Sequence, residues 1–168
     1  MTSDGVIVPA KNGTSNVTKT YPLTTPCAAS SQKVMGTIEG NFSRFGNYSW
    51  GPFSVTFRPP PVLTAGSTIP ITVSTFGFAQ NISVNVQSMS SQSMSFATNP
   101  GGHLFYPGSI TFASSTASQG SINFNISLTG TFNGATNAAK YYAGGALFEN
   151  AQWNHFLAQV TGLCKAGS

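Results

Sequence analysis

The stretch Gly120-Ser-Ile-Asn-Phe-Asn-Ile-Ser-Leu-Thr-Gly-Thr-Phe132 alternates apolar and small polar side chains along its length. Its large apolar positions are Ile122, Phe124, Ile126, Leu128 and Phe132. A strict period of two indicates a β-strand with one buried face and one solvated face. Asn133-Gly134 follows directly and is a strong turn signal. The stretch therefore predicts a central or near-central strand of a β-sheet.

Shorter alternating stretches precede this strand, separated by turn signals such as Asn99-Pro-Gly-Gly102. They cover residues 16–23, 33–45, 50–58, 68–78, 81–89, 93–97 and 109–114. In the second of them, Val34, Ile38 and Phe42 share one face with two glycines. Many short strands at close intervals are typical of antiparallel all-β domains. We expect residues 1–168 to form one mostly-β domain, a β-sandwich or jelly-roll-like fold of about seven to nine strands.

The period changes after residue 135, where helix-forming residues replace the β-branched ones. Side chains at helical spacing on one side are Trp153, Phe156, Leu157, Val160 and Cys164. This pattern predicts a C-terminal helix over 146–163, ending near Gly162, after a single helical turn at 137–142. Residues 1–15 are expected to be flexible or loop-like. The first ten lack the basic start and apolar stretch of a signal peptide, which fits either a trimmed secreted chain or a native start.

Charged side chains are scarce: they make up 6% of the 168 residues, whereas about 25% is typical of soluble domains. The net charge is +4, but no two basic residues lie closer than eight positions, so no basic track for nucleic acid is expected. No apolar run approaches the ~20 residues of a transmembrane helix. A neutral surface of Ser, Thr and Asn favours an extracellular, cell-surface or virion location and contact between copies.

Catalytic side chains are equally scarce. The acids are Asp4, Glu39 and Glu149, and the imidazoles are His103 and His155. Their spacing gives no recognisable carboxylate pair, serine triad or zinc ligand set, and no glycine-rich phosphate loop is present. We expect a protein that is not an enzyme and that uses no metal and no cofactor.

The two cysteines, Cys27 and Cys164, lie near opposite ends of the chain. An even count and an extracellular composition favour one disulfide between them. Two buried free thiols are the alternative, because cysteine is a common core residue.

Aromatic residues gather in three segments, 45–52, 103–107 and 140–142, and the first of them also contains Gly and Asn. Flat aromatic faces stack on sugars, and amides and hydroxyls bind sugar hydroxyls. The same side chains could instead contact a neighbouring subunit or fill the core. The candidate ligand-binding residues are Asn47, Tyr48, Trp50, His103 and Tyr106.

These observations favour a non-enzymatic structural or interaction protein, displayed on a cell surface or virion, that associates with itself or with another surface or virion protein. The alternative is a carbohydrate-binding lectin or adhesin domain that uses surface aromatics to bind glycans. A secreted toxin or enzyme is the third class, against which the scarcity of acids and histidines argues.

Overall fold

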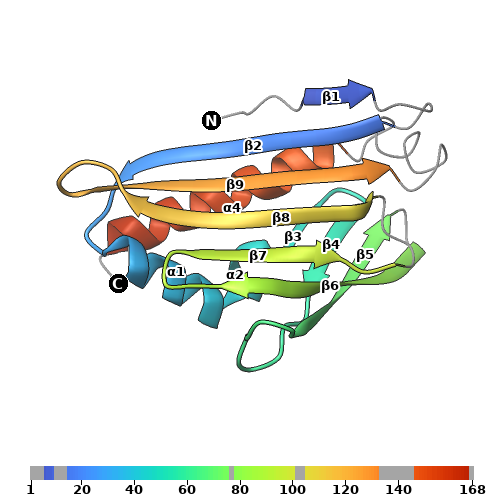
Figure 1. The fold of residues 1–168 in the computed structure, drawn as a ribbon, viewed down its shortest axis with the longest axis horizontal. Coiled ribbons are helices and arrows are strands. Elements are labelled where there is room, and N and C mark those ends of the chain that lie inside the picture. The colour runs from blue at the N-terminus through green and yellow to red at the C-terminus, as the bar shows by residue number, and fades with distance from the viewer. Residues whose placement is uncertain (1–5, 10–14, 76–77, 101–104, 133–145, 167–168) are drawn as a thin grey trace.

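The structure, a computed structural model, describes residues 6–9, 15–75, 78–100, 105–132 and 146–166 (Figure 1). The strands are β1 (Val6–Pro9), β2 (Ser15–Pro26), β3 (Tyr48–Trp50), β4 (Phe53–Phe57), β5 (Thr68–Thr75), β6 (Phe78–Met89), β7 (Ser93–Thr98), β8 (Phe105–Thr116) and β9 (Ser121–Phe132). The helices are α1 (Ser31–Gly40), α2 (Phe42–Gly46) and α4 (Ala146–Ala166). The nine strands form one sheet in the order β1-β2-β9-β8-β7-β6-β5-β4-β3.

All neighbouring strands are antiparallel, and the sheet curves around α4, which lies behind β2, β9 and β8 in Figure 1. The mostly-β antiparallel domain with a C-terminal helix is thereby confirmed. The prediction of a sandwich or jelly roll is wrong, because helices rather than a second sheet cover the apolar face. The described elements instead make one curved, barrel-like sheet that holds α4 on its inner side.

Strand β9 occupies the near-central place that its alternation predicts. It pairs with β2 from Asn16↔Thr131 to Pro26↔Ser121, and with β8 on its other side. Its apolar side chains are buried on the inner face, as Phe124 and Ile126 show. The first long strand of the chain thus meets the last, because both supply an apolar face to the same helix.

Helix α4 buries the predicted stripe of Trp153, Phe156, Leu157 and Val160. It does not stop at the exposed Gly162 but continues to Ala166. Helix propensity is outweighed here by packing, because Leu163 and Cys164, just after the glycine, are buried too. At about 1.5 Å per residue, the 21-residue helix is about 30 Å long.

Residues 33–45, predicted as a strand, form the helices α1 and α2 instead. A spacing of four fits both a strand and a helix, so Val34, Ile38 and Phe42 do not distinguish the two. Met35 does, because it is buried although strand alternation would expose it. The side chain of Ser30 caps the helix by accepting a hydrogen bond from Lys33 N (3.1 Å).

The chain before β2 also differs from its prediction. Val6–Pro9 pairs with Ser15–Thr18 as an edge strand, where a flexible or loop-like start was expected. The rest of 1–14 and the helical turn predicted at 137–142 lie outside the described residues.

The core is dominated by aromatic rings on the inner face. Phe42 of α2 contacts Phe57, Phe96 and Phe112 edge-on, with ring centroids 5.1 to 5.5 Å apart. The ring of Phe112 stacks on Phe156 of α4 at 5.1 Å. These contacts join α2, the sheet and α4 into one packed interior.

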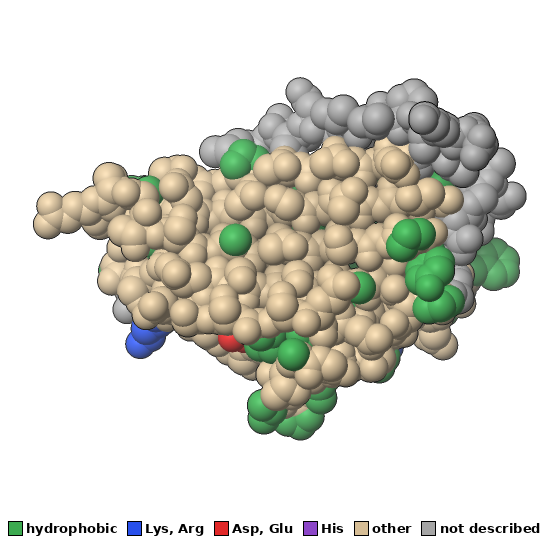
Figure 2. Space-filling model, in the orientation of Figure 1, with side chains coloured by type: hydrophobic (Ala, Val, Ile, Leu, Met, Phe, Trp, Pro, Cys, Tyr) green, Lys and Arg blue, Asp and Glu red, His purple; other side chains and the backbone are tan. Residues whose placement is uncertain are grey.

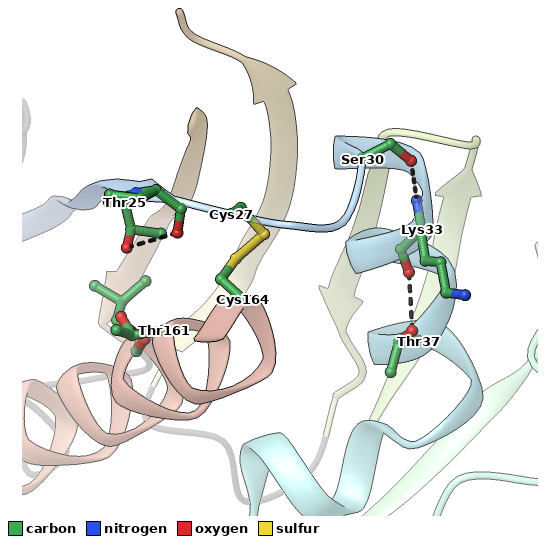
Figure 3. The surroundings of a disulfide bond; sticks show 9 residues. Thr25, Cys27, Ser30, Lys33, Thr37, Thr161 and Cys164 are labelled. Carbon is green, nitrogen blue, oxygen red and sulfur yellow. Dashed lines mark hydrogen bonds between the residues drawn. A yellow bond between two sulfur atoms is a disulfide. The ribbon is translucent and has the colours of Figure 1, made fainter. Parts of the chain in front are cut away.

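Cys27, just after β2, is joined by a disulfide to Cys164 in the last turns of α4 (Figure 3). Their Cα atoms are 4.3 Å apart although 137 positions separate them in sequence. Backbone hydrogen bonds support the junction: Cys27 N donates to Gly120 O (2.8 Å) and Ala28 N to Cys164 O (3.4 Å). The disulfide therefore closes nearly the whole domain into a loop.

Removing both sulfurs in a Cys27→Ala, Cys164→Ala variant is expected to lower the free energy of unfolding by about 2–5 kcal/mol, because the unfolded chain regains loop entropy. Denaturant unfolding measures this, and reduction of the wild-type protein should cause a similar loss. Alkylation of two thiols in folded, unreduced protein would contradict the bond.

Candidate functional site

The β3–β6 end of the sheet carries a row of residues in direct register. Trp50 of β3 faces Phe53 of β4, Phe53 faces Thr75 of β5, and Thr75 faces Phe78 of β6. Directly opposed residues of antiparallel strands point to the same face of a sheet. Phe53 contacts Phe148 of α4 at 5.7 Å, so this is the inner, helix-holding face. We call Trp50, Phe53 and Phe78 the aromatic row.

The two ends of the aromatic row are open to solvent. Trp50 is 47% exposed and Phe78 is 79% exposed, whereas Phe53 between them is half-buried. The indole of Trp50 stacks on the ring of Phe53, with centroids 6.2 Å apart and planes 19° apart. Large aromatics this exposed are uncommon on a solvated sheet and are typical of interaction surfaces.

Tyr48 and Asn47 adjoin the row but are already engaged. The half-buried ring of Tyr48 lies between Phe148 (5.8 Å) and His155 (4.9 Å) of α4. Asn47 Oδ1 accepts a hydrogen bond from Phe57 N at 2.7 Å, which ties the end of α2 to β4. Of the candidates predicted from this segment, Trp50 is the one whose ring is displayed.

The other predicted ligand residues are not in this part of the sheet. Tyr106 lies on β8, with four strands between it and β3, and is 41% exposed. His103 lies outside the described residues. The sequence alone did not indicate Phe78, because its place in the same row as Trp50 arises only from the register of three strand pairings.

A polar cluster joins the inner face of β2 to the first turns of α4. Lys19 Nζ lies 2.9 Å from Asn150 Oδ1 and 3.4 Å from Glu149 Oε1. Tyr21 Oη donates to the same amide oxygen at 2.6 Å. Burial, and secondarily the charge of Glu149, raise the pKa of Tyr21 well above its ordinary value, so the phenol stays protonated. These polar groups bind one another, so the cluster has a structural role: it joins β2 to the start of α4.

Glu39, on α1, is half-buried, and its Oε1 atom is buried without a hydrogen-bond partner. Burial raises the pKa of this carboxyl group above its ordinary value. Among the described residues, no three His, Cys, Asp or Glu side chains come together as a metal site would require.

A surface hollow of about 440 Å³ lies between β2 and the C-terminal half of α4. Leu23 and Leu157 form its apolar floor, while Asn154, Thr161 and Lys165 supply its polar lining. Lys165 is its single ionisable side chain, and it is exposed. The hollow offers apolar contact but no pair of groups for acid–base chemistry.

The outer face of the sheet is built from hydroxyls and amides. One row across five strands runs Thr20, Ser127, Thr111, Ser95 and Ser88. Figure 2 shows this face, on which charged side chains appear only at the lower margin. Because this face carries few charges, it exerts little electrostatic repulsion on another positively charged protein.

None of the helices in the described ranges is long and apolar enough to cross a bilayer.

No family model matches the sequence, and no curated protein matches it either. Solved structures share its fold. Protein Ms6760 of Mycobacterium smegmatis has a TM-score of 0.60 at 14% identity, and the match covers 100% of both chains. TTHA0849 of Thermus thermophilus gives 0.63 at 10% identity, covering 90% of this chain and 99% of that one.

The di-domain ARO/CYC StfQ of the steffimycin biosynthetic pathway gives a TM-score of 0.62 at 11% identity, covering 90% of this chain and 51% of that one. At these identities the likeness extends to the fold alone. It supports the single curved sheet with a C-terminal helix, and function has to be argued from the surface of this chain.

Glu39→Gln is expected to stabilise the protein at about pH 7 and to leave stability unchanged at about pH 3. Because the pKa of this carboxyl group is raised in the folded protein, the unfolded chain loses the proton at a lower pH than the folded protein does. The free energy of unfolding of the wild type therefore falls as the pH rises from the pKa of the unfolded chain to the raised pKa of the folded protein. Thermal unfolding at both pH values measures the difference.

Glu149→Gln is the matched control, since that carboxylate is paired with Lys19 and its loss should not stabilise. A Glu39→Gln variant that is less stable than wild type at neutral pH would contradict the burial argument.

Proposed function

We propose that this chain is a non-enzymatic structural or interaction protein that works on a cell surface or virion by binding copies of itself or another surface protein. The observation that carries the proposal is the aromatic row, which leaves Trp50 on the edge strand β3 and Phe78 at the start of β6 open to solvent. The disulfide between Cys27 and Cys164 supports an oxidising location outside the cytoplasm.

A contact at this row gains energy mainly from burying aromatic surface. Trp and Tyr dominate the energetics of protein interfaces, where truncating a central residue costs about 2 kcal/mol or more. Phe53 holds the indole of Trp50 in place by stacking, so little side-chain freedom is lost on binding. The low charge of the surrounding sheet keeps local repulsion between two copies small at this contact.

Two ionisable groups of the described chain, Glu149 and His155, support a non-enzymatic role. Glu149 is paired with Lys19, and the ring of His155 lies against Tyr48. A general acid or base must reach a substrate, and these two groups are engaged in holding α4 to the sheet.

Light scattering over a dilution series is expected to show reversible association of the wild-type chain. Trp50→Ala should weaken it by about 30-fold or more, the equivalent of a 2 kcal/mol contact. Val62→Ser is the matched control, because Val62 is 73% exposed but lies outside the row. A chain that stays monomeric at high concentration and binds no surface protein would overturn the proposal.

Carbohydrate binding is a second candidate, favoured by the stacked pair of Trp50 and Phe53. An exposed indole held flat by a second ring offers a stacking face for a sugar. Neither a metal nor a charge is needed for such a site.

A glycan array tests this second candidate. Binding to a neutral glycan that is lost in Trp50→Ala and kept in Val62→Ser would support it. Retention by no glycan, or retention unchanged in Trp50→Ala, would exclude the row as a sugar site.

A further inference from the structure

The two edges of the sheet are protected very differently. At one edge, the described part of β1 pairs with β2 from Ser15 to Thr18, and the remainder of β2 carries Pro22 and Pro26. Proline has no N–H group and blocks the addition of another strand. At the other edge, β3 consists of Tyr48, Ser49 and Trp50, with neither proline nor charge.

The hydrogen-bonding pattern of the β3–β4 hairpin points the backbone N–H and C=O groups of Ser49 away from β4. Trp50 and Phe53 oppose each other across the two-residue turn Gly51-Pro52, with Gly51 at φ 56°. The pair that closes such a turn exchanges hydrogen bonds, and the following pair, Ser49↔Ser54, does not. The N–H and C=O groups of Ser49 therefore point away from β4, and Ser49 is exposed.

The side chains on β3 are self-complementary about this residue. Tyr48 and Trp50 flank Ser49 and both lie on the inner face of the sheet. If Ser49 of two copies pair across a two-fold axis, Tyr48 of each copy lies opposite Trp50 of the other. Two aromatic cross-strand pairs then form at once, and such pairs are a main source of stability between strands.

We propose that β3 joins β3 of a second copy in antiparallel register centred on Ser49, which makes one sheet continuous through a two-fold dimer. This rests on the proposed function, for which it names the partner and the mode of contact. The short strand supplies a single pair of residues that exchange hydrogen bonds, so the aromatic side chains provide most of the contact.

The absence of charge on the β3–β4 hairpin permits a second copy to approach this edge. Each chain carries a net charge of +4, which opposes association in general. The whole hairpin from Tyr48 to Phe57 contains no charged residue, so two copies meet there without direct repulsion. A two-fold contact between identical surfaces also closes on itself, because it uses the β3 edge of both copies.

Ser49→Cys tests the register directly. Opposed residues of a hydrogen-bonded antiparallel pair have Cα atoms about 5.5 Å apart, within the range of a disulfide. Cys27 and Cys164 are already bonded to each other, so the new thiol can form only an intermolecular bridge. Mild oxidation of Ser49→Cys should give a disulfide-linked dimer, whereas Ser118→Cys, on an exposed turn outside the edge, should stay monomeric.

Ser49→Pro is the second variant. Because the Ser49 N–H points away from β4, proline there removes the intermolecular hydrogen bond and spares the hairpin. It should raise the dimer dissociation constant at least tenfold while the circular dichroism spectrum stays that of the wild type.

The outcomes separate the two proposals. A dimer that neither cross-links through position 49 nor weakens in Ser49→Pro overturns this register but leaves the proposed function standing. Equal cross-linking of Ser118→Cys also overturns the register. A monomer at every concentration, with no surface partner, overturns the proposed function and this inference with it.

Discussion

The contact between α4 and the inner face of the sheet, centred on Phe156, is the packing on which the rest of the described structure depends. The fully buried ring of Phe156 meets Phe45 of α2, Phe112 of β8 and Phe124 of β9 at 5.1 to 6.0 Å. A curved sheet of this width has one large apolar face, and in this chain a helix covers it. Without α4, that face would be open to water along β2 and β9, while α1 and α2 also contact β8.

This packing also explains where polar and covalent ties are placed. Near its start, α4 is held to β2 by Lys19 through Glu149 and Asn150, and at its end by the disulfide from Cys27 to Cys164. A buried ion pair adds little net stability, but it favours one position of the helix over its neighbours. The two ties therefore fix both the register and the ends of the helix on the sheet, and the surface is left to uncharged hydroxyls and amides.

A segment was predicted correctly where its apolar residues fit only one period, that of a strand or that of a helix. The 120–132 stretch became β9 and the 146–163 stretch became most of α4, because only one period fits each of them. The 33–45 stretch satisfied two periods at once through Val34, Ile38 and Phe42, and the contact of α2 with α4 and β4 decided for helix. No local sequence pattern indicated that helices, and not a second sheet, would cover the apolar face of the sheet.

The candidate site shows the same division. Alternation and composition, read along the chain, predicted most of the strands and the terminal helix, showed the shortage of charge and marked the aromatic segment around Trp50 as a candidate site. The tertiary structure alone decided that Phe53 and Phe78 lie in register with Trp50, that Tyr48 and Asn47 are engaged, and that Ser49 faces an open edge. The reason is physical: periodicity reports the environment of each residue along its own element, whereas the pairing of distant strands and the cover of a face depend on contacts between elements.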